Sequence, residues 1–181
     1  MTDDPREGGL VHMLDRLLRP LENVAAIIGG IFMILAMLFT TGDALLRYAF
    51  HYPLNWNLFV SENYLLVGLV CMPMAWGFRT GGYIRIAYLL HLLPPKAAQW
   101  LIRLGLLSSA LFAADLAWYA GHNWWDVYTK NLLEMDVIDF PWHWSWIWVP
   151  IGTGLLALRL LVMSIGPARR LDPATDLEEA V

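Results

Sequence analysis

Four long apolar segments follow one another along the chain, and shorter stretches with charged residues, glycine or proline separate them. They run over approximately residues 24–46, 57–78, 101–121 and 144–166. A helix that crosses a bilayer needs about 20 mostly apolar residues, and each segment meets that requirement. The pattern predicts an all-α integral membrane protein with four transmembrane helices.

The residues before the first apolar segment have an amphipathic pattern. On a helical wheel the polar side holds Asp15, Arg16, Arg19 and Glu22, opposite a stripe of Leu10, Met13, Leu14, Leu17, Leu18 and Leu21. This is the spacing of a helix with one apolar face. We expect a helix over residues 10–19 that lies along the inner membrane surface, with Pro20 as an early residue of the next helix.

A second short apolar segment, residues 83–93, lies between the pairs Gly81-Gly82 and Pro94-Pro95. As a helix of this length it would measure about 16 Å, against roughly 30 Å of hydrocarbon. It is therefore expected to lie along the inner interface. Residues 167–181 are polar and contain proline, which predicts a disordered cytoplasmic tail after a single membrane domain over residues 1–166.

The composition supports the membrane interpretation. The chain is 58% hydrophobic and 15% charged, whereas a soluble domain carries about 25% charged residues. The net charge of -4 offers no basic field for nucleic acid. Cys71 is the one cysteine, which excludes an internal disulfide or a CxxC pair.

The positions of the basic residues predict the orientation. With the N-terminus inside, every lysine and arginine except Arg47 and Lys130 falls on the inner side. The positive-inside rule then places both termini in the cytoplasm. Every tryptophan except Trp76 and Trp100 falls on the outer side, where the rings form either a lipid-facing belt or a surface for a partner protein.

The sequence offers little for catalysis or for a cofactor. Haem between helices needs histidines within the spans, but those of this chain lie at or beyond span ends: His12, His51, His91, His122 and His143. In the segment CMPM, Cys71 to Met74, the soft ligands point to different faces of a helix, and Pro73 is expected to kink it. His122 with Glu134, Asp136, Asp139 or His143 matches no known spacing of metal ligands, which favours a solvated acidic loop. We therefore expect no metal, no cofactor and no enzymatic activity.

Ionisable residues within spans are costly in lipid and are usually functional. Asp43 and Arg47 form an i,i+4 pair, which Glu62 is expected to approach at a similar depth. Asp115 lies on the outer side of the third span, and Arg159 is expected to extend toward the inner surface. Glu62 and Asp115 suit either a proton relay or polar contacts between helices or with a partner subunit.

Small residues recur every four positions on two spans: Ala25 and Gly29, Ala26 and Gly30, and Ala113, Ala117 and Gly121. Ridges of this kind let helices approach closely in lipid. They can pack within the domain or against another protein.

The order of these features resembles the small membrane subunit of tripartite ATP-independent periplasmic (TRAP) transporters, the DctQ-like family. The resemblance rests on four motifs and Glu62: DALLRYAF (43–50), RTGGYIRI (79–86), LLPP before the third span, and FPWHWSWIWVPIG (140–152). The chain departs from the family at Tyr83 and Ala87, where the family usually has histidine and aspartate.

The resemblance implies a small permease subunit in the inner membrane of a bacterium. Its partners would be a large multi-span membrane subunit and a periplasmic substrate-binding protein, in sodium-driven uptake of an organic acid such as a dicarboxylate. The residues expected to matter are Asp43, Arg47 and Glu62 as an outer polar cluster, Arg79 and Arg85 as inner anchors, and Pro150 and Gly152 as structural positions. The alternative is a stand-alone four-helix proton-coupled transporter that uses Glu62 or Asp115.

Overall fold

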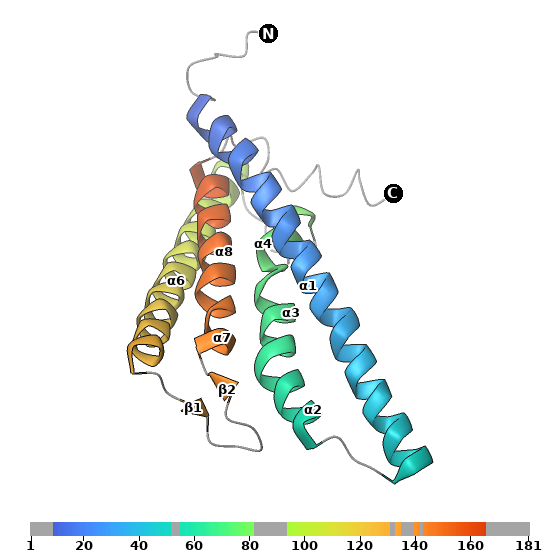
Figure 1. Cartoon of the computed structure of the whole chain (residues 1–181). Coiled ribbons are helices and arrows are strands. Elements are labelled where there is room, and N and C mark those ends of the chain that lie inside the picture. Colours follow the sequence, from blue (N-terminus) through green and yellow to red (C-terminus); the bar gives the residue numbers. More distant parts are fainter. Residues whose placement is uncertain are drawn as a thin grey trace, which may run out of the picture.

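The computed structural model describes residues 9–51, 55–81, 94–130, 133–134, 140–141 and 143–165. Three long helices dominate it (Figure 1): α1 (Gly9–Phe50), α6 (Pro95–Thr129) and α8 (Trp148–Ile165). Between α1 and α6 the chain forms α2 (Asn55–Val60), the π-helix η1 (Ser61–Leu66), α3 (Val67–Cys71) and α4 (Met74–Arg79). The short helix α7 (His143–Trp146) precedes α8.

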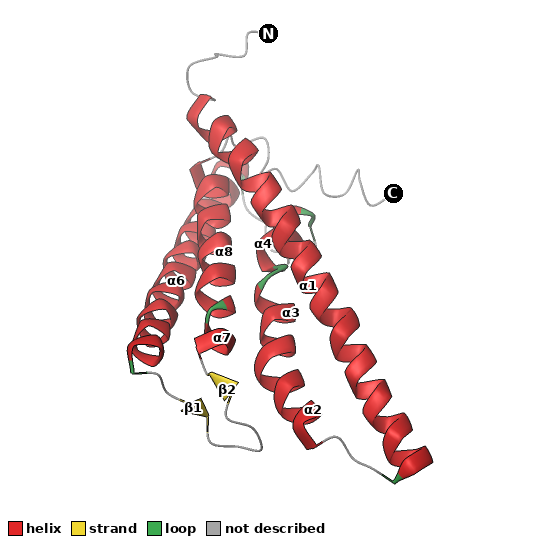
Figure 2. Ribbon diagram, in the orientation of Figure 1, coloured by secondary structure: helices red, strands yellow, loops and turns green. Residues whose placement is uncertain are grey.

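The segment that precedes α7 contains the only strands in the described part of the chain. These are β1 (Leu133–Glu134) and β2 (Phe140–Pro141), which pair antiparallel with Leu133 opposite Pro141. Figure 2 shows how small they are beside the helices. The expectation of an all-α membrane protein is thus confirmed apart from this ladder.

Three of the four expected spans coincide with long helical stretches, the last of which has one turn residue, Ile147, between α7 and α8. The stretches His12–Phe50, Ala97–Thr129 and Trp144–Ile165 are long and apolar enough to cross a membrane. The second expected span consists of α2, η1, α3 and α4 in succession, and it lies beside α1 (Figure 1). Its helix is interrupted between Cys71 and Met74, where the expected proline break occurs at Pro73.

The helices form a row in the order α1, the α2–α4 line, α8 and α6 (Figure 1). α6 makes its extensive contacts with α8 and α7, while α8 also packs against α3, α4 and α1. The core between α6 and α8 consists mainly of small side chains. Its buried residues are Ala110, Ala113, Ala157 and Leu160. Small side chains of this kind let two helices approach closely without a hydrophobic driving force from water.

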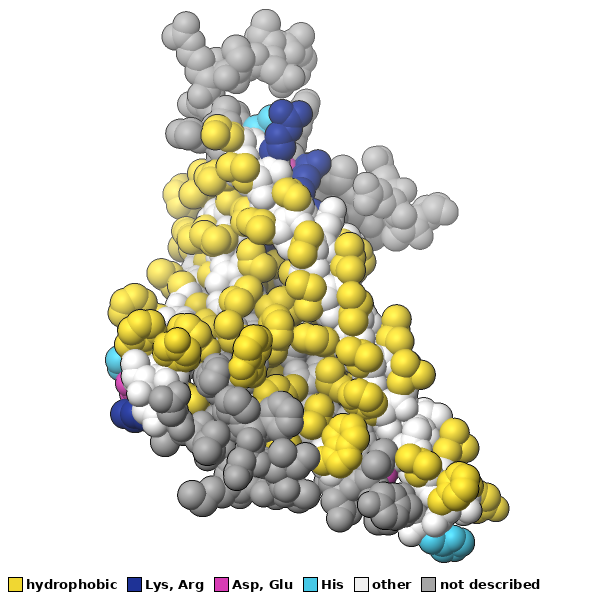
Figure 3. Space-filling model, in the orientation of Figure 1, with side chains coloured by type: hydrophobic (Ala, Val, Ile, Leu, Met, Phe, Trp, Pro, Cys, Tyr) yellow, Lys and Arg dark blue, Asp and Glu magenta, His cyan; other side chains and the backbone are white. Residues whose placement is uncertain are grey.

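The outer surface of the row is apolar. Large hydrophobic side chains are exposed along α1 and α6, and Figure 3 shows them spread over the visible face. The basic side chains in that view gather mainly near the beginning of α1 (Figure 3). A surface of this kind suits lipid or protein contact rather than water.

The expectation of a separate interfacial helix over residues 10–19 is wrong. α1 is one helix of 42 residues with Pro20 inside it, so Pro20 does not begin a new helix. Asp15 lies five residues before Pro20 and Glu22 two residues after it, and both contact the same arginine of α8, which holds the segment in line. Leu14, Leu17 and Leu21 of the apolar stripe are exposed, whereas Asp15 and Glu22 of the polar side are buried against the other helices.

Two expected features lie outside the described residues. One is the interfacial helix over residues 83–93, which includes Arg85, Tyr83 and Ala87. The other is the tail over residues 167–181.

Candidate functional site

A charge cluster joins three helices near the beginning of α1. Its members are Asp15, Arg19 and Glu22 of α1, Arg79 at the end of α4, and Arg159 of α8. Asp15, Glu22 and Arg159 are only 1%, 0% and 5% exposed. Residues seven apart lie on the same face of a helix, so Asp15 and Glu22 both point toward the guanidinium that α8 supplies.

Arg159 lies between the two carboxylates of α1. Its Nη1 atom is 2.5 Å from Asp15 Oδ1, and its Nε atom is 3.6 Å from Glu22 Oε1. Arg19, one helical turn after Asp15, places Nη2 at 2.8 Å from the second oxygen of that carboxylate. The expectation that Arg159 extends toward the inner surface stays a prediction, and the structure adds two acidic partners on a distant segment that the sequence analysis did not pair with it.

Arg79 completes the cluster from α4. Its Nη1 atom is 3.0 Å from Glu22 Oε2, and its Nη2 atom donates a hydrogen bond to Asn23 Oδ1 at 2.5 Å. A further bond runs from Nη1 to the carbonyl oxygen of Arg19 at 3.4 Å. Arg79 thus joins the end of α4 to α1. It contacts Glu22, which also contacts Arg159 of α8.

The ion pairs of the cluster join helices α1, α4 and α8 to one another, which indicates a structural role rather than a catalytic one. Two buried carboxylates meet the buried guanidinium of Arg159 and the partly buried one of Arg79, and the exposed Arg19 adds a third cation. Withdrawing such charges from water is costly, and the cost is offset only when each ion has close partners. No group of three or more histidine, cysteine or acidic side chains gathers to hold a metal ion in the described ranges.

At the opposite end of α1 the predicted pair of Asp43 and Arg47 is present. Arg47 Nη2 lies 2.9 Å from Asp43 Oδ2, with the arginine side chain 67% exposed. Glu62 is exposed on η1, and it makes no hydrogen bond or ion pair with the residues that the structure describes. The structure thus shows the pair of Asp43 and Arg47, and it gives no contact between Glu62 and either of them.

Loss of the Arg47 guanidinium is expected to change stability little. Exposed i,i+4 pairs contribute about 0.3–0.5 kcal/mol because water screens them. Arg47→Ala should therefore shift the free energy of unfolding of the purified protein in detergent by no more than about that amount. A loss above about 2 kcal/mol would show that Arg47 has a larger structural role than this ion pair.

Buried polar side chains, which the sequence analysis did not single out, form hydrogen bonds that join α1, α2, η1 and α7. Asn57 Nδ2 donates to the carbonyl oxygen of Phe39 at 3.2 Å and joins α2 to α1. The Ser61 hydroxyl contacts Asn57 Oδ1 at 3.3 Å, and the Ser145 hydroxyl donates to the carbonyl oxygen of Asn63, which joins α7 to η1. Their signal in the sequence is their polarity within otherwise apolar segments.

Glycines set the closest approaches between helices. A Cβ atom on Gly152 would overlap the carbonyl group of Cys71 in α3, and one on Gly68 would overlap the ring of Phe32 in α1. Pro150, the other residue expected in this region, faces Gly121 of α6. The two residues that the last motif contributes, Pro150 and Gly152, therefore lie at helix contacts.

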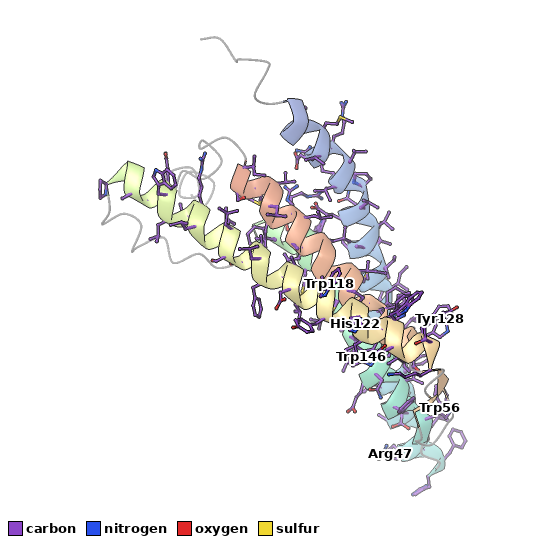
Figure 4. All side chains as sticks on the ribbon, turned by 90° about the vertical axis from the view of Figure 1, so that its left-hand side faces the viewer. Arg47, Trp56, Trp118, His122, Tyr128 and Trp146 are labelled. Carbon is purple, nitrogen blue, oxygen red and sulfur yellow. The ribbon has the colours of Figure 1, made fainter. Side chains whose placement is uncertain are left out.

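The aromatic residues expected on the outer side gather at one end of the molecule. Figure 4 shows Trp56, Tyr128 and Trp146 near the same end as Arg47. Trp124 stacks on Tyr128 with ring centroids 5.6 Å apart, and Phe32 contacts Trp148 edge-on at 5.1 Å. Several of these rings are exposed, which suits an interface with lipid headgroups or with protein.

A comparison with protein families gives one match. The family described as the DctQ component of tripartite ATP-independent periplasmic transporters matches residues 36–170. No curated protein and no solved structure matches the chain. The matched range includes Arg79, Arg159 and Gly152, whereas Asp15 and Glu22 precede it.

Proposed function

Because the chain belongs to the DctQ family of TRAP transporter components and is thus a small membrane subunit, we propose that it is the scaffold of its transporter. The observation that carries this proposal is the charge cluster, which ties α1, α4 and α8 together at one point. A scaffold subunit needs helices that keep fixed positions while the partner subunit moves against them. Buried ion pairs and close glycine contacts favour such a fixed arrangement.

The partner of this scaffold is a large membrane subunit that contains the transport path. A periplasmic binding protein delivers an organic acid such as a dicarboxylate, and a sodium gradient drives uptake. Family membership supports these roles. The charge cluster supports them indirectly, because its buried arginine, Arg159, is already bound to Asp15 and Glu22 and is not presented to a substrate anion.

The membrane is the inner membrane of a bacterium, and both termini lie in the cytoplasm. Basic side chains near the beginning of α1 and aromatic rings at the opposite end support this orientation (Figures 3 and 4). The charge cluster then lies toward the cytoplasmic side, and the pair of Asp43 and Arg47 lies toward the periplasm.

Reconstitution of the three-component system tests the proposal. The chain should co-purify with the large membrane subunit of its own transporter, and sodium-dependent uptake into proteoliposomes should require both subunits and the binding protein. The control is a set of liposomes that lack one component at a time. Uptake by the lone chain, lost in Glu62→Gln, would instead support the stand-alone transporter, for which the described residues give no further support.

A further inference from the structure

Asp115 is an exposed acid in the middle of a long apolar helix. It lies within the Ala97–Thr129 stretch of α6, and its side chain is exposed without a hydrogen bond or ion pair to any described residue. A charge at the centre of a bilayer is costly, and such residues usually face protein or a water-filled space. None of the residues that the structure describes covers the exposed side chain of Asp115, which points to an environment supplied from outside the chain.

The packing of α6 on α8 gives the depth of Asp115. Ala113 of α6 belongs to the same buried core as Ala157 of α8, and Gly121 of α6 faces Pro150 of α8. The two helices are antiparallel, so Asp115 lies between these two levels and near the middle of the Trp144–Ile165 stretch. Its carboxylate therefore lies at the depth at which lipid offers no polar partner.

Asp115 is not alone on its face of α6. The exposed residues Ser108, Phe112, Tyr119 and His122 recur with it at alternating spacings of four and three, which places all five on one side of the helix. This α6 face points away from the buried alanines Ala110 and Ala113 that contact α8. Figure 4 views the molecule from the α6 side, with His122 toward the end where Arg47 lies.

We propose that this α6 face is the docking surface for a transmembrane helix of the large membrane subunit, and that this helix carries a basic or hydrogen-bond-donating side chain at the level of Asp115. The proposal rests on the proposed function, which supplies the large subunit. Charge complementarity selects the occupant, because a carboxylate in hydrocarbon is stabilised by a cation or a donor.

A second copy of this chain fits the surface poorly. A two-fold interface brings the same patch of both subunits together, so two Asp115 carboxylates would face one another in low dielectric. Lipid fits poorly for the reason already given. A partner helix of opposite chemistry satisfies both constraints, and the aromatic rings of Phe112 and Tyr119, 71% and 66% exposed, provide the surrounding apolar contact.

Site-specific cross-linking tests the surface. Benzoylphenylalanine replaces Phe112 or Tyr119 in the chain co-expressed with the large membrane subunit, and Leu158 on α8 provides an exposed control position. Both α6 positions should cross-link the large subunit, with much less product at Leu158. Cross-links that join two copies of this chain, or an absence of protein cross-links in a complex that still co-purifies, would overturn the proposal.

Substitution of Asp115 tests the charge. In detergent, Asp115→Leu should retain about tenfold less large subunit than the native chain, and Asp115→Asn an intermediate amount, because a buried charged contact is worth at least that factor. The isolated Asp115→Leu chain should remain as stable as the native one, which separates docking from folding. Undiminished retention of the large subunit by Asp115→Leu would contradict the assignment. If the native chain itself fails to co-purify, the proposed function fails instead.

Discussion

Replacing Arg159 with alanine is expected to destabilise the protein by about 3–5 kcal/mol, because removing one partner of a buried ion pair leaves the other charge without compensation. Here two carboxylates are affected, since the guanidinium contacts both Asp15 and Glu22. Glu22 keeps Arg79 at 3.0 Å, and Asp15 keeps the exposed Arg19. The free energy of unfolding should be measured in mixed micelles through the fluorescence of the ten tryptophans.

A double-mutant cycle separates the ion pair from a general packing defect. Asp15→Leu combined with Arg159→Leu removes both charges and leaves the contact between Glu22 and Arg79 in place. Replacing a buried pair by apolar residues is often nearly neutral. The loss of unfolding free energy in the double variant should therefore be smaller than the sum of the losses in the two single variants. A coupling energy of about 1–3 kcal/mol is expected for groups in direct contact.

Arg47→Ala is the matched control for the Arg159 variants. Arg47 also pairs with an aspartate, but its side chain is 67% exposed, whereas that of Arg159 is 6% exposed. The two variants should therefore differ by about 3 kcal/mol or more in their effect. Equal and small losses for both, or strictly additive losses in the Asp15 and Arg159 cycle, would show that the cluster does not hold the helices together.

The positions of the apolar helices followed directly from the sequence, because in lipid both length and hydropathy are decisive. Proline at position 73 correctly predicted a break in the second span. Pro20 did not break α1, although the residue type is the same. The difference is tertiary: Arg159 contacts acids on both sides of Pro20, and local propensity does not include such a contact.

The charge cluster could not be assembled from sequence patterns alone. Asp15 and Arg159 are separated by 144 positions, and the pattern around Asp15 is that of an ordinary amphipathic helix. We expected its polar face to lie toward water, whereas the structure buries Asp15 and Glu22 of that face and exposes Leu14, Leu17 and Leu21. A usable signal was present, because a buried arginine within a span requires an acid, and Asp15 and Glu22 are seven positions apart on one face.

Local pairs were easier to predict than surfaces. The pair of Asp43 and Arg47 needed only the i,i+4 rule. Of the small-residue ridges, Ala113 packs within the domain, whereas a Cβ on Gly30 would meet no atom within 4 Å. Which ridge faces a neighbour depends on the order of the helices in the row, and the sequence does not determine that order.

Gly152→Ala is expected to cost about 3 kcal/mol, the upper part of the usual range for overpacking a well-packed contact. The added Cβ would overlap the carbonyl carbon and oxygen of Cys71, so the backbones of α3 and α8 must separate. Main-chain atoms cannot rotate away as a flexible side chain can. Separation at this level would also loosen the contact between α8 and the α2–α4 line, and the loss should appear as a lower free energy of unfolding in micelles.

Gly154→Ala, two residues further along the same helix, is the matched control. No atom lies within 4 Å of the position where its Cβ would stand, so the substitution adds no clash. Alanine is favoured over glycine in a helix interior by about 1 kcal/mol, and Gly154→Ala should therefore be neutral or slightly stabilising. The two variants make the same chemical change in the same helix, so their difference measures the contact with Cys71. If Gly152→Ala is as stable as Gly154→Ala, the close approach of α3 and α8 does not hold the scaffold together.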